Sequence, residues 1–120
     1  MDLQLDGRKA LVTGGSRGIG LAISRAFTAE GATVAITYHP SESSPQQLKA
    51  EGAIDWFAPM EAANPESVRE ACSTVIERYG RVDILVANAG YAEISPVTDL
   101  TIEQFDRMTA VHLRAPFLCV

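Results

Sequence analysis

Residues 10–27 constrain the fold more than any other part of the chain, because a short apolar run, a glycine-rich turn and a helical repeat follow one another there. The run "ALVT" is prone to form a strand and is ended by glycines. Apolar residues then recur at helical spacing: Ile19, Ala22, Ile23, Ala26 and Phe27. Gly31 stops the repeat. The pattern predicts a strand that passes through a tight turn directly into a helix.

Apolar runs and helical repeats alternate through the rest of the chain. The predicted strands cover residues 33–37, 54–57 and 82–87, and the predicted helices cover residues 46–51, 64–80 and 101–120. A polar loop spans residues 39–45. Regular alternation with short connections predicts parallel strands joined by right-handed crossovers. We therefore expect an α/β fold, an open doubly wound parallel sheet in which residues 1–120 supply a βαβαβαβα unit.

The helix at residues 64–80 has the clearest local signals. Asn64 is expected to cap it, Pro65 stands at the first helical position, and Gly80 lies where a left-handed cap belongs. The run at residues 82–87 is apolar at nearly every position, as in a parallel strand covered on both faces.

Composition narrows the functional class. A net charge of −5 with scattered charges argues against a nucleic-acid surface. Cys72 and Cys119 have no spacing that suggests a disulfide or a metal site, and Cys72 falls on an apolar helix face. We find neither a signal-peptide pattern nor the ~18 apolar residues of a membrane helix. We therefore expect a cytoplasmic protein with reduced cysteines, no membrane partner and no bound metal.

The turn between the first strand and helix places Gly14, Gly18 and Gly20 at the spacing G-x-x-x-G-x-G. Free backbone N–H groups and the helix dipole at a helix N-terminus favour a pyrophosphate. Glycines allow positive φ and a close approach of the ligand. The competing interpretation is an ordinary glycine-rich turn, which the strand–turn–helix context makes less attractive.

Three segments carry a resemblance. "TGGSRGIG" resembles the TGxxxGxG fingerprint of the classical short-chain dehydrogenase/reductase family, "ANAG" at residues 87–90 resembles its NNAG signature, and "VHLRAPF" resembles its VNxxxxF segment. The order and spacing match and span nearly the whole chain. The resemblance implies a Rossmann fold and an NADP(H)- or NAD(H)-dependent oxidoreductase that interconverts a carbonyl and an alcohol on a small organic or acyl substrate.

The end of the second strand predicts which cofactor binds. An acidic residue there would hold the ribose hydroxyls of NAD, but Thr37, Tyr38 and His39 are not acidic. Arg17 can pair with a 2′-phosphate, although a solvated surface arginine is the alternative. We therefore expect NADP(H) rather than NAD(H). The predicted cofactor-binding residues are Gly14, Ser16, Arg17, Gly18, Ile19, Gly20, Tyr38, His39, Ser41, Asn88, Ala89 and Gly90.

Two departures from the family pattern concern the adenosine end. By resemblance, residues 87–90 lie under the adenosine ribose, and the amide of Asn88 bridges backbone groups. Ala87 replaces the first asparagine of the family pair. Glu61 stands where the family carries an aspartate near the adenine, or that aspartate is missing.

The family's proton-transfer groups are a serine, a Tyr-x-x-x-Lys pair and an asparagine that completes a water relay. The chain contains no Tyr-x-x-x-Lys, and by resemblance that motif falls after Val120. His112 stands at the asparagine position. It is either a core-facing histidine or a substitute in the relay. Pro116 is expected to kink the helix and to free the carbonyl of His112.

Three hypotheses remain. The chain is the cofactor-binding half of an oxidoreductase, inactive by itself and a homo-oligomer when complete; or a short non-catalytic protein that binds a dinucleotide or a partner; or a structural fragment without a ligand. Tyr91, Glu93 and Ile94 either line the substrate pocket or are ordinary loop residues.

Overall fold

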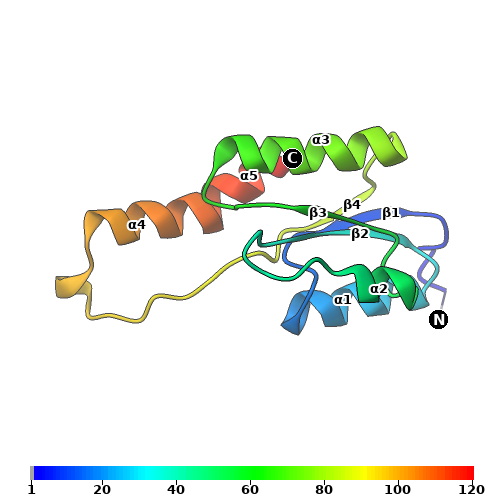
Figure 1. Cartoon of the computed structure of the whole chain (residues 1–120), viewed down its shortest axis with the longest axis horizontal. Helices are drawn as coiled ribbons and strands as arrows, with labels where there is room; N and C mark the ends of the chain where they lie inside the picture. The colour runs from blue at the N-terminus through cyan, green and yellow to red at the C-terminus, as the bar shows by residue number, and fades with distance from the viewer. Residues whose placement is uncertain (1) are drawn as a thin grey trace.

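A computed structural model describes residues 2–120 and contains a four-stranded parallel sheet in the order β3-β2-β1-β4 (Figure 1). The predicted α/β fold and the order of its elements are confirmed. The strands are β1 (Lys9–Val12), β2 (Thr33–Tyr38), β3 (Trp56–Pro59) and β4 (Ile84–Val86). The helices are α1 (Gly18–Ala29), α2 (Gln46–Ala50), α3 (Pro65–Tyr79), α4 (Ile102–Thr109) and α5 (Ala115–Cys119).

Strand β1 lies at the centre of the sheet, and the order of the strands reverses there. Leu11 aligns with Ala35 of β2 on one side and with Leu85 of β4 on the other. The helices consequently cover opposite faces of the sheet, with α1 and α2 on one face and α3 and α5 on the other (Figure 1). In open sheets of this kind, ligands bind outside the carboxyl ends of the strands at the point of reversal. We therefore expect a ligand site at the carboxyl ends of β1 and β4.

Alternate residues of β1 and β2 build the two halves of the core. Val12 and Ile36 are fully buried and pack toward α1, where Ile23 and Phe27 meet them. Their neighbours along the strands point toward α3 and surround Val75. Both faces of the central strands are thus covered, which explains their continuous apolar sequences.

Helix α3 begins and ends as predicted. The Asn64 side chain accepts hydrogen bonds from the backbone N–H groups of Glu66 and Ser67, at 3.0 and 3.3 Å. Pro65 opens the helix, and Gly80 closes it with φ = 76°. Both ends of α3 are therefore set by local sequence.

Strand β4 differs from its prediction. The apolar run at residues 82–87 predicts a strand covered on both faces, but Ile84–Val86 are only half-buried. In the described part of the chain β4 pairs with β1 alone and forms the outer strand of the sheet. A long connection then leads through a 3₁₀ turn (Val97–Asp99) to α4, which projects beyond the sheet (Figure 1).

The predicted helix at residues 101–120 is divided into three segments. A π-helical turn (Ala110–Arg114) separates α4 from α5, and the N–H of Ala115 donates to the carbonyl of Ala110. The added residue in the turn precedes Pro116, whose ring would clash with a carbonyl in an unbroken α-helix. The predicted irregularity is therefore present and takes the form of a widened turn.

Candidate functional site

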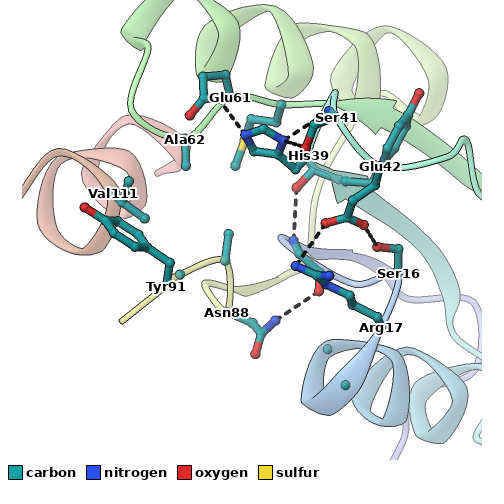
Figure 2. A pocket seen from close by; sticks show the side chains of 18 of the residues that line it. Ser16, Arg17, His39, Ser41, Glu42, Glu61, Ala62, Asn88, Tyr91 and Val111 are labelled. Carbon is teal, nitrogen blue, oxygen red and sulfur yellow. Dashed lines mark hydrogen bonds and ion pairs between the residues drawn. The ribbon is translucent and has the colours of Figure 1, made fainter. Parts of the chain in front are cut away.

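A cavity of about 790 Å³ opens at the carboxyl ends of β1, β2 and β4 (Figure 2). All twelve residues predicted to bind the cofactor lie on its wall. The wall also contains Thr37, Glu42, Met60, Glu61, Ala62, Tyr91, Arg107 and Val111. Of these, the sequence indicates only Glu61 and Tyr91 as candidates for a site. Five segments distant in sequence thus converge on one space, and four of them follow or end the parallel strands.

The glycine turn is anchored to strand β2 through Thr37. The N–H of Gly14 donates to the Thr37 hydroxyl at 3.1 Å, and the N–H of Gly15 donates to the Thr37 carbonyl at 3.1 Å. Gly15 packs so tightly that an added Cβ would lie 2.5 Å from the Cγ2 atom of Ile36. The turn is therefore held against the core before any ligand arrives.

Asn88 ties the same turn to the end of β4. Its Nδ2 amide donates to the carbonyls of Thr13 and Gly14, both at 3.1 Å, and its backbone N–H donates to the Thr13 hydroxyl at 3.0 Å. The predicted bridging of backbone groups by this amide is confirmed. An added Cβ at Gly20 would lie 2.5 Å from that Nδ2 atom and 2.2 Å from the Gly14 carbonyl oxygen, so only glycine fits there.

The N-terminus of α1 differs from those of α3 and α4. Asn64 and Thr101 cap the latter two helices, whereas Arg17 at the N-cap of α1 makes no side-chain hydrogen bond to its helix. The first turn of α1 also contains no acidic residue. Its N–H groups and the positive end of the helix dipole are left for an anion from the cavity.

Glu42 reaches into this region from the polar loop after β2. The Ser16 hydroxyl donates to its carboxylate at 2.8 Å, and the Arg17 guanidinium lies 3.5 Å from its other oxygen (Figure 2). Glu42 lies three residues beyond positions 37–39, where an acidic residue that binds the ribose of NAD is expected. The sequence gives its charge but not the path of the loop that brings it back to the turn.

His39 and Glu61 close the far side of the cavity. The Nε2 atom of His39 lies 2.6 Å from the Glu61 carboxylate, and its Nδ1 atom lies 2.7 Å from the Ser41 hydroxyl (Figure 2). Glu61 therefore stands at the end of β3, beside the cavity, where the aligned acidic residue was expected.

His112 lies outside the wall of the cavity and contacts its neighbour Tyr91. Its ring stacks on Tyr91 at 5.8 Å between centroids, and its Nε2 atom lies 2.6 Å from the Tyr91 carbonyl. This distance fits an Nε2–H that donates to the carbonyl. Of the two alternatives for His112, the core-facing histidine is wrong, because its side chain is exposed and the π-turn gives the buried positions to Ala110, Val111 and Ala115.

Tyr91 lies on the cavity wall, near Glu93 and Arg107. Desolvation and the nearby Glu93 carboxylate raise its pKa, while Arg107, whose guanidinium lies 5.3 Å from the ring centroid, opposes them. The hydroxyl is buried and has no hydrogen-bond partner among the described residues. Residues 91–94 were expected either to line a pocket or to be ordinary loop residues. Tyr91 lies on the cavity wall, whereas Ile94 is exposed on the connecting loop.

Two further findings concern metal ions and membranes. Within residues 2–120, no three His, Cys, Asp or Glu side chains gather as metal ligands would. None of the helices described is both long and apolar enough to cross a membrane.

Known proteins resemble the chain in both sequence and fold. A family model described as short chain dehydrogenase matches residues 8–120. The chain is 38% identical to D-threitol dehydrogenase of Mycolicibacterium smegmatis over 98% of its own length and 46% of that protein. It is 36% identical to versicolorin reductase 1 of Aspergillus parasiticus, covering 95% of itself and 45% of that protein. The chain thus spans about half the length of these relatives.

Solved structures agree with the sequence comparisons. A short chain dehydrogenase from Burkholderia cenocepacia in complex with NADP superimposes with a TM-score of 0.87 at 40% identity, over 96% of this chain and 49% of that one. A blue fluorescent protein from a metagenomic library, in complex with NADPH, gives the same TM-score at 39% identity and the same coverage.

Proposed function

The chain belongs to the short-chain dehydrogenase/reductase family, and from this premise we propose that the complete protein is an NADP(H)-dependent oxidoreductase. It would interconvert a carbonyl and an alcohol on a small organic or acyl substrate, with these 120 residues as its cofactor-binding half. NADPH supplies the hydride in such a reaction. The two relatives in complex with NADP or NADPH support this choice of cofactor.

The observation that carries the proposal is the uncapped N-terminus of α1 beside an exposed arginine. An anion that enters the cavity meets the free N–H groups of the first turn and the guanidinium of Arg17. The turn has room for a ligand, because an added Cβ at Gly18, where φ is +57°, would meet no atom within 4 Å. A dinucleotide with an additional phosphate matches this combination of dipole and fixed charge.

Each predicted residue has a role in the proposal. Gly14, Gly18, Ile19 and Gly20 hold the pyrophosphate through backbone N–H groups and close approach. Arg17, with Ser16, His39 and Ser41, binds the 2′-phosphate. Tyr38 and the segment Asn88, Ala89 and Gly90 face the adenosine.

His112 is proposed to substitute for asparagine in a proton relay. Its Nε2 atom is engaged with the Tyr91 carbonyl, so the proton would have to pass through Nδ1. The serine and the Tyr-x-x-x-Lys pair that complete the family's chemistry are proposed to lie outside these residues. On this basis the 120-residue chain binds cofactor without turnover, and the complete protein is a cytoplasmic homo-oligomer.

Isothermal titration of the chain with NADP⁺ and NAD⁺ tests the cofactor assignment. Arg17→Ala should weaken NADP⁺ binding roughly tenfold, because a charge-assisted hydrogen bond contributes about 1.5–3 kcal/mol and part of it is screened at this exposed side chain, and should leave NAD⁺ binding unchanged. Arg25→Ala is the matched control, because Arg25 also lies on α1 but pairs with Glu51 away from the cavity. Equal losses for both nucleotides in Arg17→Ala, or tighter binding of NAD⁺ by the unaltered chain, would refute the assignment.

Turnover is tested on the full-length gene product with NADPH and a panel of carbonyl compounds. NADPH oxidation by the full-length protein and none by the 120-residue chain is the expected result. Oxidation at equal rates by both proteins would overturn the division of roles.

A further inference from the structure

The carboxylate of Glu42 lies where the cavity offers its best anion contacts. It reaches across 26 positions of sequence to accept a hydrogen bond from Ser16 and to pair with Arg17. The loop places it there through a turn in which the N–H of Glu42 donates to the His39 carbonyl at 2.9 Å. The Glu42 side chain is 23% exposed, whereas that of Arg17 is 81% exposed. The carboxylate is thus the more enclosed partner.

A phosphate would need the same contacts. Ser16 has one hydroxyl hydrogen, and it is given to Glu42. The guanidinium of Arg17 faces the same carboxylate. Carboxylate and phosphate are both oxygen anions that bind arginine and hydroxyl donors. A ligand phosphate at this position therefore competes with Glu42 for its partners.

The competition can be resolved in the ligand's favour, but at a cost. The separation of 3.5 Å between Arg17 and Glu42 and the exposure of the arginine indicate a weak pair, so the carboxylate can be displaced. A displaced carboxylate on a short loop remains within a few ångströms of the phosphate. Like charges this close repel each other at a protein surface, so the displaced carboxylate weakens the binding of the phosphate.

Neighbouring charges do not cancel this repulsion. The imidazole of His39 is already engaged, since its Nε2 atom lies 2.6 Å from the Glu61 carboxylate. Arg107, on the opposite wall, lies over the ring of Tyr91. Arg17 is therefore the only unstacked guanidinium among the described residues of the cavity wall, and that wall also contains the carboxylates of Glu42 and Glu61.

We infer that Glu42 is a specificity-determining residue whose carboxylate occupies the anion position beside Ser16 and Arg17 and lowers the affinity for a 2′-phosphate relative to a 2′-hydroxyl. This inference rests on the proposed function. It also explains why Arg17, the proposed partner of the 2′-phosphate, is paired with Glu42 when no nucleotide is bound.

The test uses two fragments of the cofactor as probes, 2′,5′-ADP and 5′-AMP, titrated calorimetrically into the 120-residue chain. Glu42→Gln should raise the affinity for 2′,5′-ADP roughly tenfold, within the range expected from removing one like charge, and change the affinity for 5′-AMP less than twofold. Glu42→Ala should act in the same direction. Glu51→Gln is the matched control, because Glu51 also pairs with an α1 arginine, Arg25, outside the cavity, and should change neither affinity.

The alternative outcomes are distinct. A loss of 5′-AMP affinity in Glu42→Gln would overturn the inference, because Glu42 would then be an acceptor for ribose hydroxyls. Equal changes for both probes, or no change, would also overturn it while leaving the cofactor site in place. If neither probe binds the unaltered chain or any variant, the proposed function fails and the inference fails with it.

Discussion

Replacing Asn88 tests whether the glycine turn is held by the sheet or merely lies beside it. Its amide donates two hydrogen bonds, to the carbonyls of Thr13 and Gly14. Thr13 is 3% exposed, so water cannot readily replace the lost donor. With about 1 kcal/mol for each bond, Asn88→Ala should lower the free energy of unfolding by ~2 kcal/mol.

The aspartate variant sharpens this prediction. Asn88→Asp preserves the shape of the side chain but turns an oxygen toward two carbonyl oxygens. It should therefore cost more than Asn88→Ala, by about 1 kcal/mol or more, because a partly buried carboxylate is left without a donor. A mechanism based on lost packing predicts the opposite order, since alanine removes more atoms.

Urea denaturation of the chain, followed by circular dichroism, measures both changes. Gln47→Ala is the control, because Gln47 is an exposed amide on α2 whose side chain makes no hydrogen bond to the other described residues. It should change the free energy of unfolding by less than ~0.5 kcal/mol. A loss below ~0.5 kcal/mol for Asn88→Ala, or a smaller loss for the aspartate variant, would refute the anchoring role.

Three further predictions concern backbone, cap and thiol. Gly20→Ala should destabilise the chain by more than ~2 kcal/mol, because its Cβ would lie 2.2 Å from a carbonyl oxygen. Gly18→Ala should cost only the ~1–2 kcal/mol of a non-glycine residue in the left-handed conformation. Equal losses for the two variants in urea denaturation would contradict this. Asn64→Ala should lower the free energy of unfolding by ~1 kcal/mol, because α3 loses its cap, and Asn64→Asp should lower it much less. Equal losses for these two variants in the same urea denaturation would contradict this. A hydrogen bond from the Cys119 thiol lowers the pKa of Cys72 to about 7, so alkylation of Cys72 should rise as pH increases through 7. Cys119→Ala should slow that alkylation at pH 7 roughly tenfold, and an unchanged rate would exclude the hydrogen bond.

Local signals in the sequence were sufficient for most of the fold. Helix α3 has its cap, its first-turn proline and its terminal glycine within its own residues, so both ends could be predicted. The orientation of His112 could not be predicted, because it depends on how the chain accommodates Pro116. A kinked α-helix and a π-turn both satisfy the proline, but they rotate the preceding residues differently.

Part of the site could likewise be predicted from the sequence, and part could not. Its twelve predicted residues follow strands whose carboxyl ends must meet in a parallel sheet, so their convergence on one cavity follows from topology. Their roles in binding remain predictions. The contact of Glu42 with the glycine turn could not be predicted, because it depends on a turn at His39 and on the direction of a polar loop. Neither has a periodic signal in the sequence.

Thr37 gives the turn a property that concerns the entropy of binding. With its hydroxyl and its carbonyl it holds the amides of Gly14 and Gly15 from within the buried core. A segment that is already ordered loses little conformational freedom when a ligand arrives, so most of the ordering cost must fall on the loop that holds Glu42. Amide hydrogens at the turn should then exchange with solvent as slowly as those of β1, and those of residues 40–44 much faster.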